Sequence, residues 1–283
     1  MDVELRDAKL ARTKATLISA RSGWRSVDFA ELWAYRELFS VLVMRDIKVR
    51  YKQTALGATW AIIQPVMTMV AFSIFFGKLA NMPSDGLPYP IFSYAALLPW
   101  LFFANSVTAS AGSLVGSSHL ITKVYFPRLI IPLSSIGANI VDFAIAGVVL
   151  LLMMLYYGIG WGWNLLAAPL LTFGVMFAAL GVGTFLAALT AAYRDFRYVV
   201  PFMLQFWMFV TPIAYPSSIV PEAWRWLLYL NPLTGLIEGF RSAFLGVAFN
   251  VPALVGSVVV SSVLLAAGIA YFERVERRFA DIV

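Results

Sequence analysis

Six stretches of this chain are apolar enough and long enough to cross a lipid bilayer, and most of its basic residues lie on one side of them. A crossing helix needs about 20 apolar residues. The predicted spans cover residues 58–79, 89–115, 129–157, 165–192, 198–214 and 251–272, within a transmembrane domain of residues 58–283. Of the 21 Lys and Arg residues, 18 fall before the first span, in the second and fourth loops and in the C-terminal tail. Because Lys and Arg are retained on the cytoplasmic side during insertion, we predict an all-α polytopic membrane protein with six transmembrane helices and both termini in the cytoplasm.

The composition argues against several other classes of function. Hydrophobic residues make up 61% of the chain and charged residues 13%, whereas a soluble domain has about one half and one quarter. The net charge of +6 does not indicate nucleic-acid binding, because the basic residues flank apolar spans and anionic lipid headgroups account for them. The chain has no Cys and one His, which excludes disulfides and leaves a zinc site short of ligands. An integral membrane enzyme, such as an acyl- or glycosyltransferase, would need clustered acids and histidines at the membrane surface, and these are missing.

The residues before the first span predict two different segments. Residues 1–27 are polar and mixed in charge, so we expect a cytoplasmic arm rather than a cleaved signal peptide. Residues 28–56 predict an N-terminal amphipathic interface helix that lies in the membrane surface. Its apolar face consists of Leu32, Tyr35, Phe39 and Leu42. The alternative is a soluble amphipathic helix that packs on another domain.

Residues 216–250 are largely apolar, but they do not predict a seventh crossing. A seventh crossing would place the charged C-terminal tail outside, against the positive-inside rule. Two short re-entrant helices between the fifth and sixth spans, interrupted at Asn231 and Pro232, fit better. Backbone that leaves the helical path at membrane depth needs protein or a water-filled cavity around it. We therefore predict that this pair borders a pore and acts as its gate.

A series of short motifs occurs in register with these spans. Residues 45–60 read RDIKVRYKQTALGATW, and Gln64 and Pro65 follow. YFPR precedes the third span, YRD separates the fourth from the fifth, and NPLT leads to Glu238, Phe240 and Arg241. Over residues 29–272 the chain resembles the ABC type-2 permeases that export polysaccharides, which are the membrane subunits for lipid-linked O-antigen, capsule and teichoic acid export.

The resemblance implies a homodimeric channel in which each six-helix subunit sits on a separate nucleotide-binding ATPase subunit, present in two copies. The sequence has no G-x-x-x-x-G-K-[ST] phosphate loop, so ATP and Mg are expected on the partner subunit. We expect no bound cofactor and no enzymatic activity for this chain. The expected cargo is a lipid-linked polysaccharide such as the O-antigen of lipopolysaccharide biosynthesis, moved across the bacterial inner membrane. The alternative within the same family is a permease for a drug or a small lipid.

Two cytoplasmic segments are predicted to couple this chain to the ATPase subunit. The loop of residues 117–128 predicts a short amphipathic helix that Ser117 or Ser118 caps and Pro127 ends. A simple cytoplasmic turn is the alternative there. The end of the interface helix is the second expected contact. The predicted coupling residues are Arg45, Lys48, Arg50, His119, Lys123, Tyr125 and Arg128.

The predicted channel lining and gate combine polar and aromatic side chains. They are Asn139, Asp142, Trp224, Trp226, Tyr229, Asn231, Glu238 and Arg241. Asp142 lies deep within a predicted span, where an unpaired charge costs at least about 2.5–3.5 kcal/mol, so it should face the bundle interior near Asn139. It either meets sugar hydroxyls or makes an internal hydrogen bond. Glu238 and Arg241 are three residues apart, and such a pair either forms an outer gate or neutralises itself. The aromatic residues either form an ordinary membrane belt or stack on sugar rings.

Overall fold

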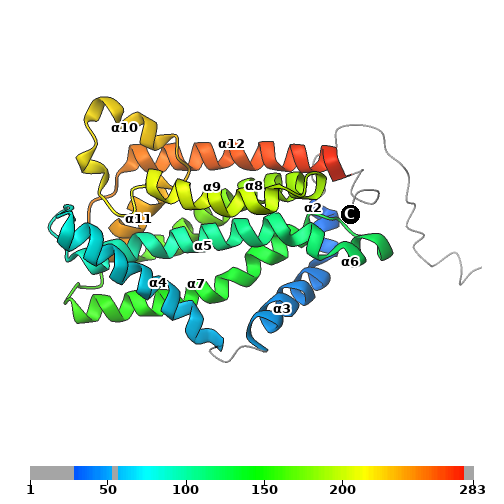
Figure 1. Ribbon diagram of the computed structural model, residues 1–283, viewed down its shortest axis with the longest axis horizontal. Helices are drawn as coiled ribbons and strands as arrows, with labels where there is room; N and C mark the ends of the chain where they lie inside the picture. Colours follow the sequence, from blue (N-terminus) through cyan, green and yellow to red (C-terminus); the bar gives the residue numbers. More distant parts are fainter. Residues whose placement is uncertain (1–28, 53–56, 277–283) are drawn as a thin grey trace, which may run out of the picture.

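A computed structural model describes residues 29–52 and 57–276, and every regular element in this part of the chain is a helix (Figure 1). Five of its helices are long and apolar enough to cross a membrane: Gly57–Leu79, Tyr89–Gly116, Ile130–Tyr156, Trp163–Ala192 and Val251–Glu276. The helix at the remaining predicted span, the fifth, is shorter but also apolar: Phe196–Val210. The prediction of an all-α polytopic membrane protein is therefore confirmed. The predicted arm of residues 1–27, residues 53–56 and the tail of residues 277–283 lie outside the described residues.

The helices follow one another along the chain with short connections. They are α2 (Phe29–Ala34), α3 (Arg36–Lys52), η1 (Gly57–Thr59), α4 (Trp60–Phe72), η2 (Ser73–Leu79), α5 (Tyr89–Gly116), α6 (Ser118–Lys123), α7 (Ile130–Tyr156), η3 (Trp163–Ala167), α8 (Ala168–Ala192), α9 (Phe196–Val210), η4 (Ser217–Ile219), α10 (Glu222–Tyr229), α11 (Thr234–Leu245) and α12 (Val251–Glu276). In Figure 1 the long helices run side by side, with α2, α3 and α6 at one end of the bundle and α10 and α11 at the other. We call these the inner end and the outer end, after the orientation that the sequence predicts.

Helix α9 is shorter than each of the five helices that are long enough to cross a membrane. Its 15 residues give a helix of about 22 Å, which is shorter than the hydrocarbon core of about 30 Å. The chain leaves the helix at Thr211, whose backbone is extended, and Pro212 follows directly. The predicted fifth span of residues 198–214 therefore ends earlier in the structure, because the residue before a proline is disfavoured in the helical region.

Helix α5 is the centre of the bundle. It packs against α4, α7, α8, α9 and α11, and most of its side chains are buried. Phe92, Tyr94 and Phe103 are among the largest fully buried side chains. The Tyr94 hydroxyl donates a hydrogen bond of 3.0 Å to the Ala146 carbonyl of α7, so the one polar atom of this buried ring is satisfied.

Helices α8 and α12 approach each other closely because glycine lies at their contact. A Cβ atom on Gly268 would lie 2.2 Å from the Gly181 carbonyl oxygen, and one on Gly181 would lie 2.6 Å from the Leu265 backbone nitrogen. Small residues that let two backbones meet are typical of helix pairs within membranes, where apolar burial against lipid supplies little driving force. This contact fixes the last span on the rest of the bundle.

The predicted apolar face, which α2 and α3 share, packs on the protein itself. Leu42 is buried, and Leu32, Tyr35 and Phe39 pack against the same core cluster, which includes residues from α5, α6, α7, α8 and α12. The position of α3 in the membrane surface stays a prediction. The apolar side chains that would contact lipid in that position pack against the other helices. The pattern could not distinguish these surroundings, because lipid chains and apolar side chains are equally suitable neighbours for such a face.

Candidate functional site

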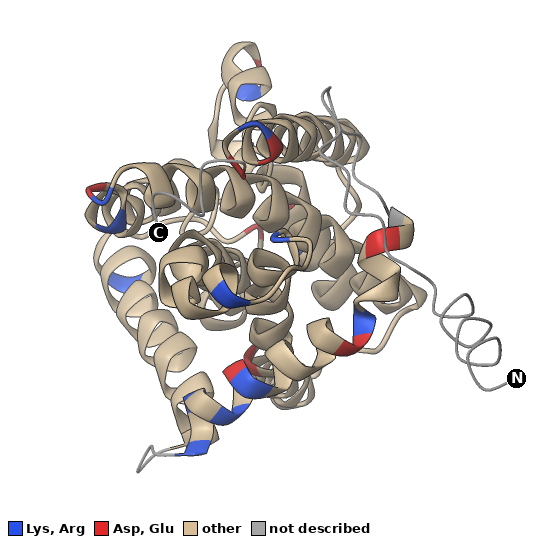
Figure 2. Cartoon of the chain, turned by 90° about the vertical axis from the view of Figure 1, so that its right-hand side faces the viewer, with Lys and Arg blue, Asp and Glu red and all other residues tan. Residues whose placement is uncertain are grey.

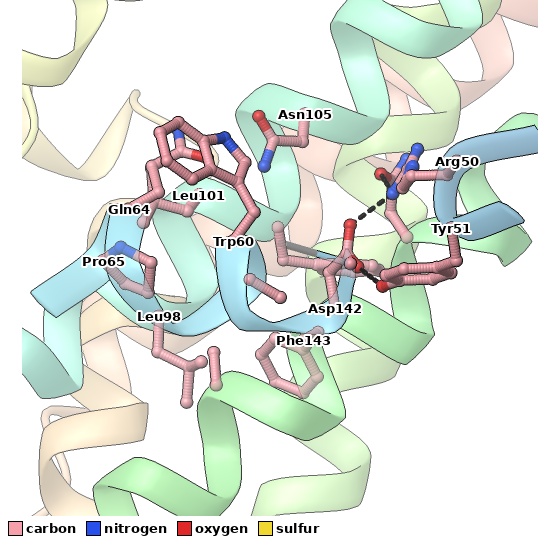
Figure 3. A pocket seen from close by; sticks show the side chains of 15 residues that line it. Arg50, Tyr51, Trp60, Gln64, Pro65, Leu98, Leu101, Asn105, Asp142 and Phe143 are labelled. Atoms are coloured by element: carbon pink, nitrogen blue, oxygen red, sulfur yellow. Dashed lines mark hydrogen bonds and ion pairs between the residues drawn. The ribbon is translucent and has the colours of Figure 1, made fainter. Parts of the chain in front are cut away.

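The C-terminal end of α3 meets the middle of α7 through a polar cluster of Arg50, Tyr51, Asn139 and Asp142 (Figure 3). Arg50 Nη1 donates a hydrogen bond of 2.8 Å to Asn139 Oδ1 and forms an ion pair with Asp142 Oδ2. The Tyr51 hydroxyl donates to Asp142 Oδ1. Both carboxylate oxygens therefore have a donor, and Asp142 carries the compensation that an acid within an apolar span needs.

The cluster is held in orientation but not sealed from its surroundings. Asn139 Nδ2 donates 2.9 Å to the Ser135 carbonyl, which directs its oxygen toward Arg50. Burial, and then the hydrogen bond to Asp142, raise the pKa of Tyr51 to about 12, so the phenol stays protonated and can donate. The side chains of Arg50 and Asp142 remain 35% and 23% exposed. Solvent partly screens an ion pair with this exposure, so the pair stabilises the fold less than its charges alone would suggest.

The cluster forms one wall of a cavity of about 460 Å³. The other walls come from the start of α4, the middle of α5 and α7. The lining comprises Arg50, Tyr51, Gly57, Trp60, Ala61, Gln64, Pro65, Leu98, Leu101, Phe102, Asn105, Asn139, Asp142, Phe143 and Ala146. Aromatic and aliphatic surface with a few polar groups is typical of ligand sites. Figure 3 shows Trp60, Gln64 and Asn105 on the α4 and α5 side and Arg50, Tyr51 and Asp142 across from them.

At the outer end, Arg241 of α11 is buried and binds backbone carbonyls. Its three guanidinium nitrogens donate to Phe92 O at 3.3 Å, Pro212 O at 2.9 Å and Ile213 O at 2.7 Å. The guanidinium carbon also lies 3.7 Å from the centroid of the Phe92 ring. Arg241 thereby joins α11 to the start of α5 and to the segment after α9. Among the described residues it forms no ion pair with Glu238, although the spacing of the two residues permits one.

Glu238 and Asn231 have other partners at the outer end. Glu238 Oε2 accepts a hydrogen bond of 2.9 Å from Asn250, while Glu238 Oε1 is buried without a partner among the described residues. Asn231 lies between α10 and α11, where its Oδ1 accepts from the Trp207 indole at 3.2 Å and its Nδ2 donates to the Thr211 hydroxyl at 2.9 Å. These contacts hold the interrupted segment together. The predicted pore-lining roles of Asn231, Glu238 and Arg241 stay predictions.

The aromatic residues of α10 have different surroundings from those of Asn231. Trp224 and Trp226 are 60% and 56% exposed, and Tyr229 Oη accepts a 3.4 Å hydrogen bond from Asn250. Side chains this exposed can contact lipid, a second subunit or a passing molecule. Their assignment to a membrane belt or to a sugar path stays open.

The predicted coupling residues divide into exposed and bound groups. Figure 2 looks onto the inner end, where Lys and Arg segments lie on several helices, α3 among them. The exposed group is Arg45, Lys48, His119, Lys123 and Tyr125. Arg45 forms an ion pair of 2.8 Å with its neighbour Asp46.

The bound group is Arg50 and Arg128. Arg50 lies in the polar cluster, and the Arg128 side chain donates to the Glu276 carbonyl at the end of α12. Helix α6 ends at Lys123, four residues before Pro127, and Ser117 occupies its N-cap position without a side-chain hydrogen bond. The expected limits of this helix were therefore wrong at its C-terminal end, because Val124 already adopts an extended backbone.

Among the residues that line the cavity and had no role predicted from the sequence, four have polar side-chain atoms. They are Tyr51, Trp60, Gln64 and Asn105. Gln64 and Asn105 carried a usable signal, since an amide within an apolar span is costly unless it faces protein or water. The cavity also brings together residues of two predicted groups, since Arg50 was predicted to couple to the ATPase subunit and Asp142 to line the channel.

Comparison with known proteins gives relatives that cover most of the chain. The profile of the ABC-2 type transporter family matches residues 37–245. The O-antigen export system permease protein RfbA of Myxococcus xanthus is 30% identical over 258 residues, which are 89% of this chain and 98% of the relative. The polysialic acid transport protein KpsM of Escherichia coli is 24% identical over 71% of this chain and 79% of its own length. The inner membrane transport permease YadH of Escherichia coli K12 is 25% identical over 66% and 76%.

Proposed function

This chain belongs to the ABC-2 type transporter family, and on that premise we propose that it is the permease subunit of an exporter of a lipid-linked polysaccharide such as O-antigen. The observation that carries the proposal is the 30% identity to an O-antigen export permease across 98% of that protein's length. The polysialic acid transport protein adds a second relative whose name states a polysaccharide cargo. Subunits of this family do not hydrolyse ATP, so the energy comes from a separate chain.

The full exporter consists of two copies of this chain and two copies of a nucleotide-binding ATPase subunit, which carries ATP and Mg. The ATPase subunit binds the inner end, where exposed basic and aromatic residues of α3 and of the segment around α6 offer contacts. A short helix such as α6, held at the end of long α5, can transmit a push from a partner as a rigid body. Arg45, Lys48, His119, Lys123 and Tyr125 are the residues we assign to this contact.

The cavity beside α4, α5 and α7 is part of the path of the polysaccharide. Trp60, Phe102 and Phe143 supply flat apolar surface for the C–H faces of sugar rings. Gln64, Asn105 and Asn139 supply amide donors and acceptors for sugar hydroxyls. At the outer end α10 and α11 form the re-entrant pair, with Glu238, Asn231 and Arg241 holding its base and the exposed Trp224, Trp226 and Tyr229 at the pore mouth.

The chain lies in the bacterial inner membrane with both termini in the cytoplasm. The relative YadH is named as an inner membrane permease, and the basic residues of α3, α6 and the loop before α9 share the inner end. Because the sequence contains no Cys, single cysteines at positions 2, 163 and 283 can be labelled one at a time. Only position 163 should react with an impermeant maleimide added outside whole cells, and labelling of position 283 from outside would contradict this orientation.

Export in cells tests the proposed function. The chain and the nucleotide-binding protein that co-purifies with it are produced in a bacterium whose own O-antigen permease gene is deleted. We expect surface polysaccharide to return and the lipid-linked precursor inside the cell to fall. If surface polysaccharide stays absent and the cells gain resistance to a drug, the result would favour the drug or small-lipid exporter. ATP hydrolysis by the purified chain alone would contradict its role as a permease.

A further inference from the structure

Helix α3 is attached to α7 at two points of different character. The first is apolar: Gly137 of α7 leaves room for Val43 and Phe39, and a Cβ atom on Gly137 would lie 3.1 Å from Val43 Cγ2 and 3.5 Å from Phe39 Cζ. The second is the polar cluster at the C-terminal end of α3. Apolar contacts resist separation of two helices but allow small sliding between them, whereas directional hydrogen bonds fix their register.

The polar attachment is also a wall of the cavity. Of the described residues of α3, Arg50 and Tyr51 line the cavity, and both bind Asp142 of α7. Asn139 lies one turn before Asp142, lines the same cavity and also accepts from Arg50. The residues that fix α3 on α7 are therefore the residues that shape this side of the cavity (Figure 3).

We propose that Arg50, Tyr51, Asn139 and Asp142 form a latch that makes α3 and α7 move as one body, so that a displacement of α3 changes the wall of the cavity directly. This inference rests on the proposed function, because the ATPase subunit supplies the displacement. It assigns Arg50 and Asp142 as positioning residues and leaves the exposed Arg45 and Lys48 to contact the partner. The latch acts between the surface that receives the push and the cavity that the cargo occupies.

Disulfide formation measures the attachment without any partner or cargo. The sequence contains no Cys, so Val43→Cys with Gly137→Cys introduces a single possible intrachain pair at the apolar contact. The purified chain is oxidised for increasing times, and the remaining thiols are counted from the gel shift with a polyethylene-glycol maleimide. We expect rapid loss of both thiols in the otherwise unchanged chain, and a rate about tenfold lower after Asp142→Asn, because an amide donor then opposes Arg50 or Tyr51.

Export by the complete complex then tests whether the latch transmits movement. Asp142→Asn should lower polysaccharide export per ATP hydrolysed about tenfold, and Arg36→Gln, an exposed change on the same helix, should leave it within about twofold. Oxidising the cysteine pair in the Asp142→Asn chain should restore export to within about threefold of the unchanged complex, and dithiothreitol should remove the rescue. The exchange variant Arg50→Asp with Asp142→Arg should also recover part of the loss, which a role of either residue in packing alone would not explain.

Several results would overturn the latch. A disulfide that stops export in the chain with intact Arg50 and Asp142 would show that α3 must slide on α7. A disulfide that forms in the Asp142→Asn chain but restores nothing would indicate that Asp142 acts on the cargo instead. Failure of the pair to form in the otherwise unchanged chain would contradict the close contact on which the latch depends. By contrast, an unchanged complex that exports no polysaccharide, with the thiol result as expected, would refute the proposed function and leave the attachment standing.

Discussion

The two ends of the bundle each use an arginine to join helices, and the two guanidinium groups have opposite surroundings. At the outer end Arg241 is 5% exposed and binds carbonyls of Phe92, Pro212 and Ile213. At the inner end Arg50 is 35% exposed and binds a carboxylate and an amide beside a cavity. Backbone carbonyls cannot leave without rearranging the chain, whereas solvent partly screens the exposed ion pair of Arg50 and Asp142. The comparison indicates that the outer junction is a fixed assembly point of the core, and that the inner junction holds α3 on α7 with a smaller contribution to stability.

Removing Arg241 should have the largest effect on stability. Arg241→Gln leaves buried carbonyls of three residues without their donors, at about 1–3 kcal/mol for each unsatisfied group, so we expect a loss of about 3 kcal/mol or more. The free energy of unfolding is measured by titrating sodium dodecyl sulfate into the detergent-solubilised chain. Arg225→Gln is the matched control, since Arg225 also donates to carbonyls at this end but sits on the more exposed α10. Equal losses for the two variants would contradict the special contribution of the buried Arg241 to stability.

Filling the contact between α11 and α12 should have the next largest effect. A Cβ atom on Gly235 would lie 2.1 Å from the Ala253 carbonyl oxygen, so Gly235→Ala must push these helices apart. We expect a loss of about 1–3 kcal/mol in the same titration. Gly147→Ala on α7 is the control, because nothing lies within 4 Å of its added Cβ atom. An unchanged free energy of unfolding for Gly235→Ala would mean that α11 and α12 can move apart at little cost. The outer end would then not be a fixed assembly point.

Breaking the inner ion pair should cost less stability than either outer change. Asp142→Asn removes a charge from a pair that solvent partly screens, so we expect a loss of about 1 kcal/mol. The titration is run beside that of Arg241→Gln under identical conditions. A loss as large as that of the outer variant would contradict the smaller contribution of the inner junction to stability.

The smallest change in stability should come from exposed lysines at the two ends. Lys123→Glu at the inner end and Lys78→Glu at the outer end should each alter the free energy of unfolding by about 0.5 kcal/mol or less, since both side chains are exposed. Only Lys123→Glu should reduce export per ATP hydrolysed if the ATPase subunit binds the inner end, as we propose. Reduced export by both variants would remove the functional difference between the ends.

Much of the fold could be predicted from the chain because its cause is local. A run of about 20 apolar residues must satisfy its backbone polar groups internally once in lipid, and a helix does so within the segment itself. The limits of α5 and α7 therefore follow the predicted spans closely, whereas α9 ends early because Pro212 constrains the residue before it. The interruption near Asn231 and Pro232 was predicted for the same local reason, although the membrane position of α10 and α11 stays a prediction.

The site depended on contacts that no local pattern encodes. The sequence alone indicates that Asp142 needs a partner for its charge, because an unpaired acid in an apolar span is costly. That partner is Arg50, which lies 92 residues earlier in the chain. It is identified by the tertiary structure, because many basic residues at the inner end were equally suitable from the sequence. The partners of Arg241 are even harder to predict from the sequence. They are backbone carbonyls, which every residue carries, so no residue type identifies them. Their convergence on one guanidinium exists only when α5, α11 and the segment after α9 are packed together.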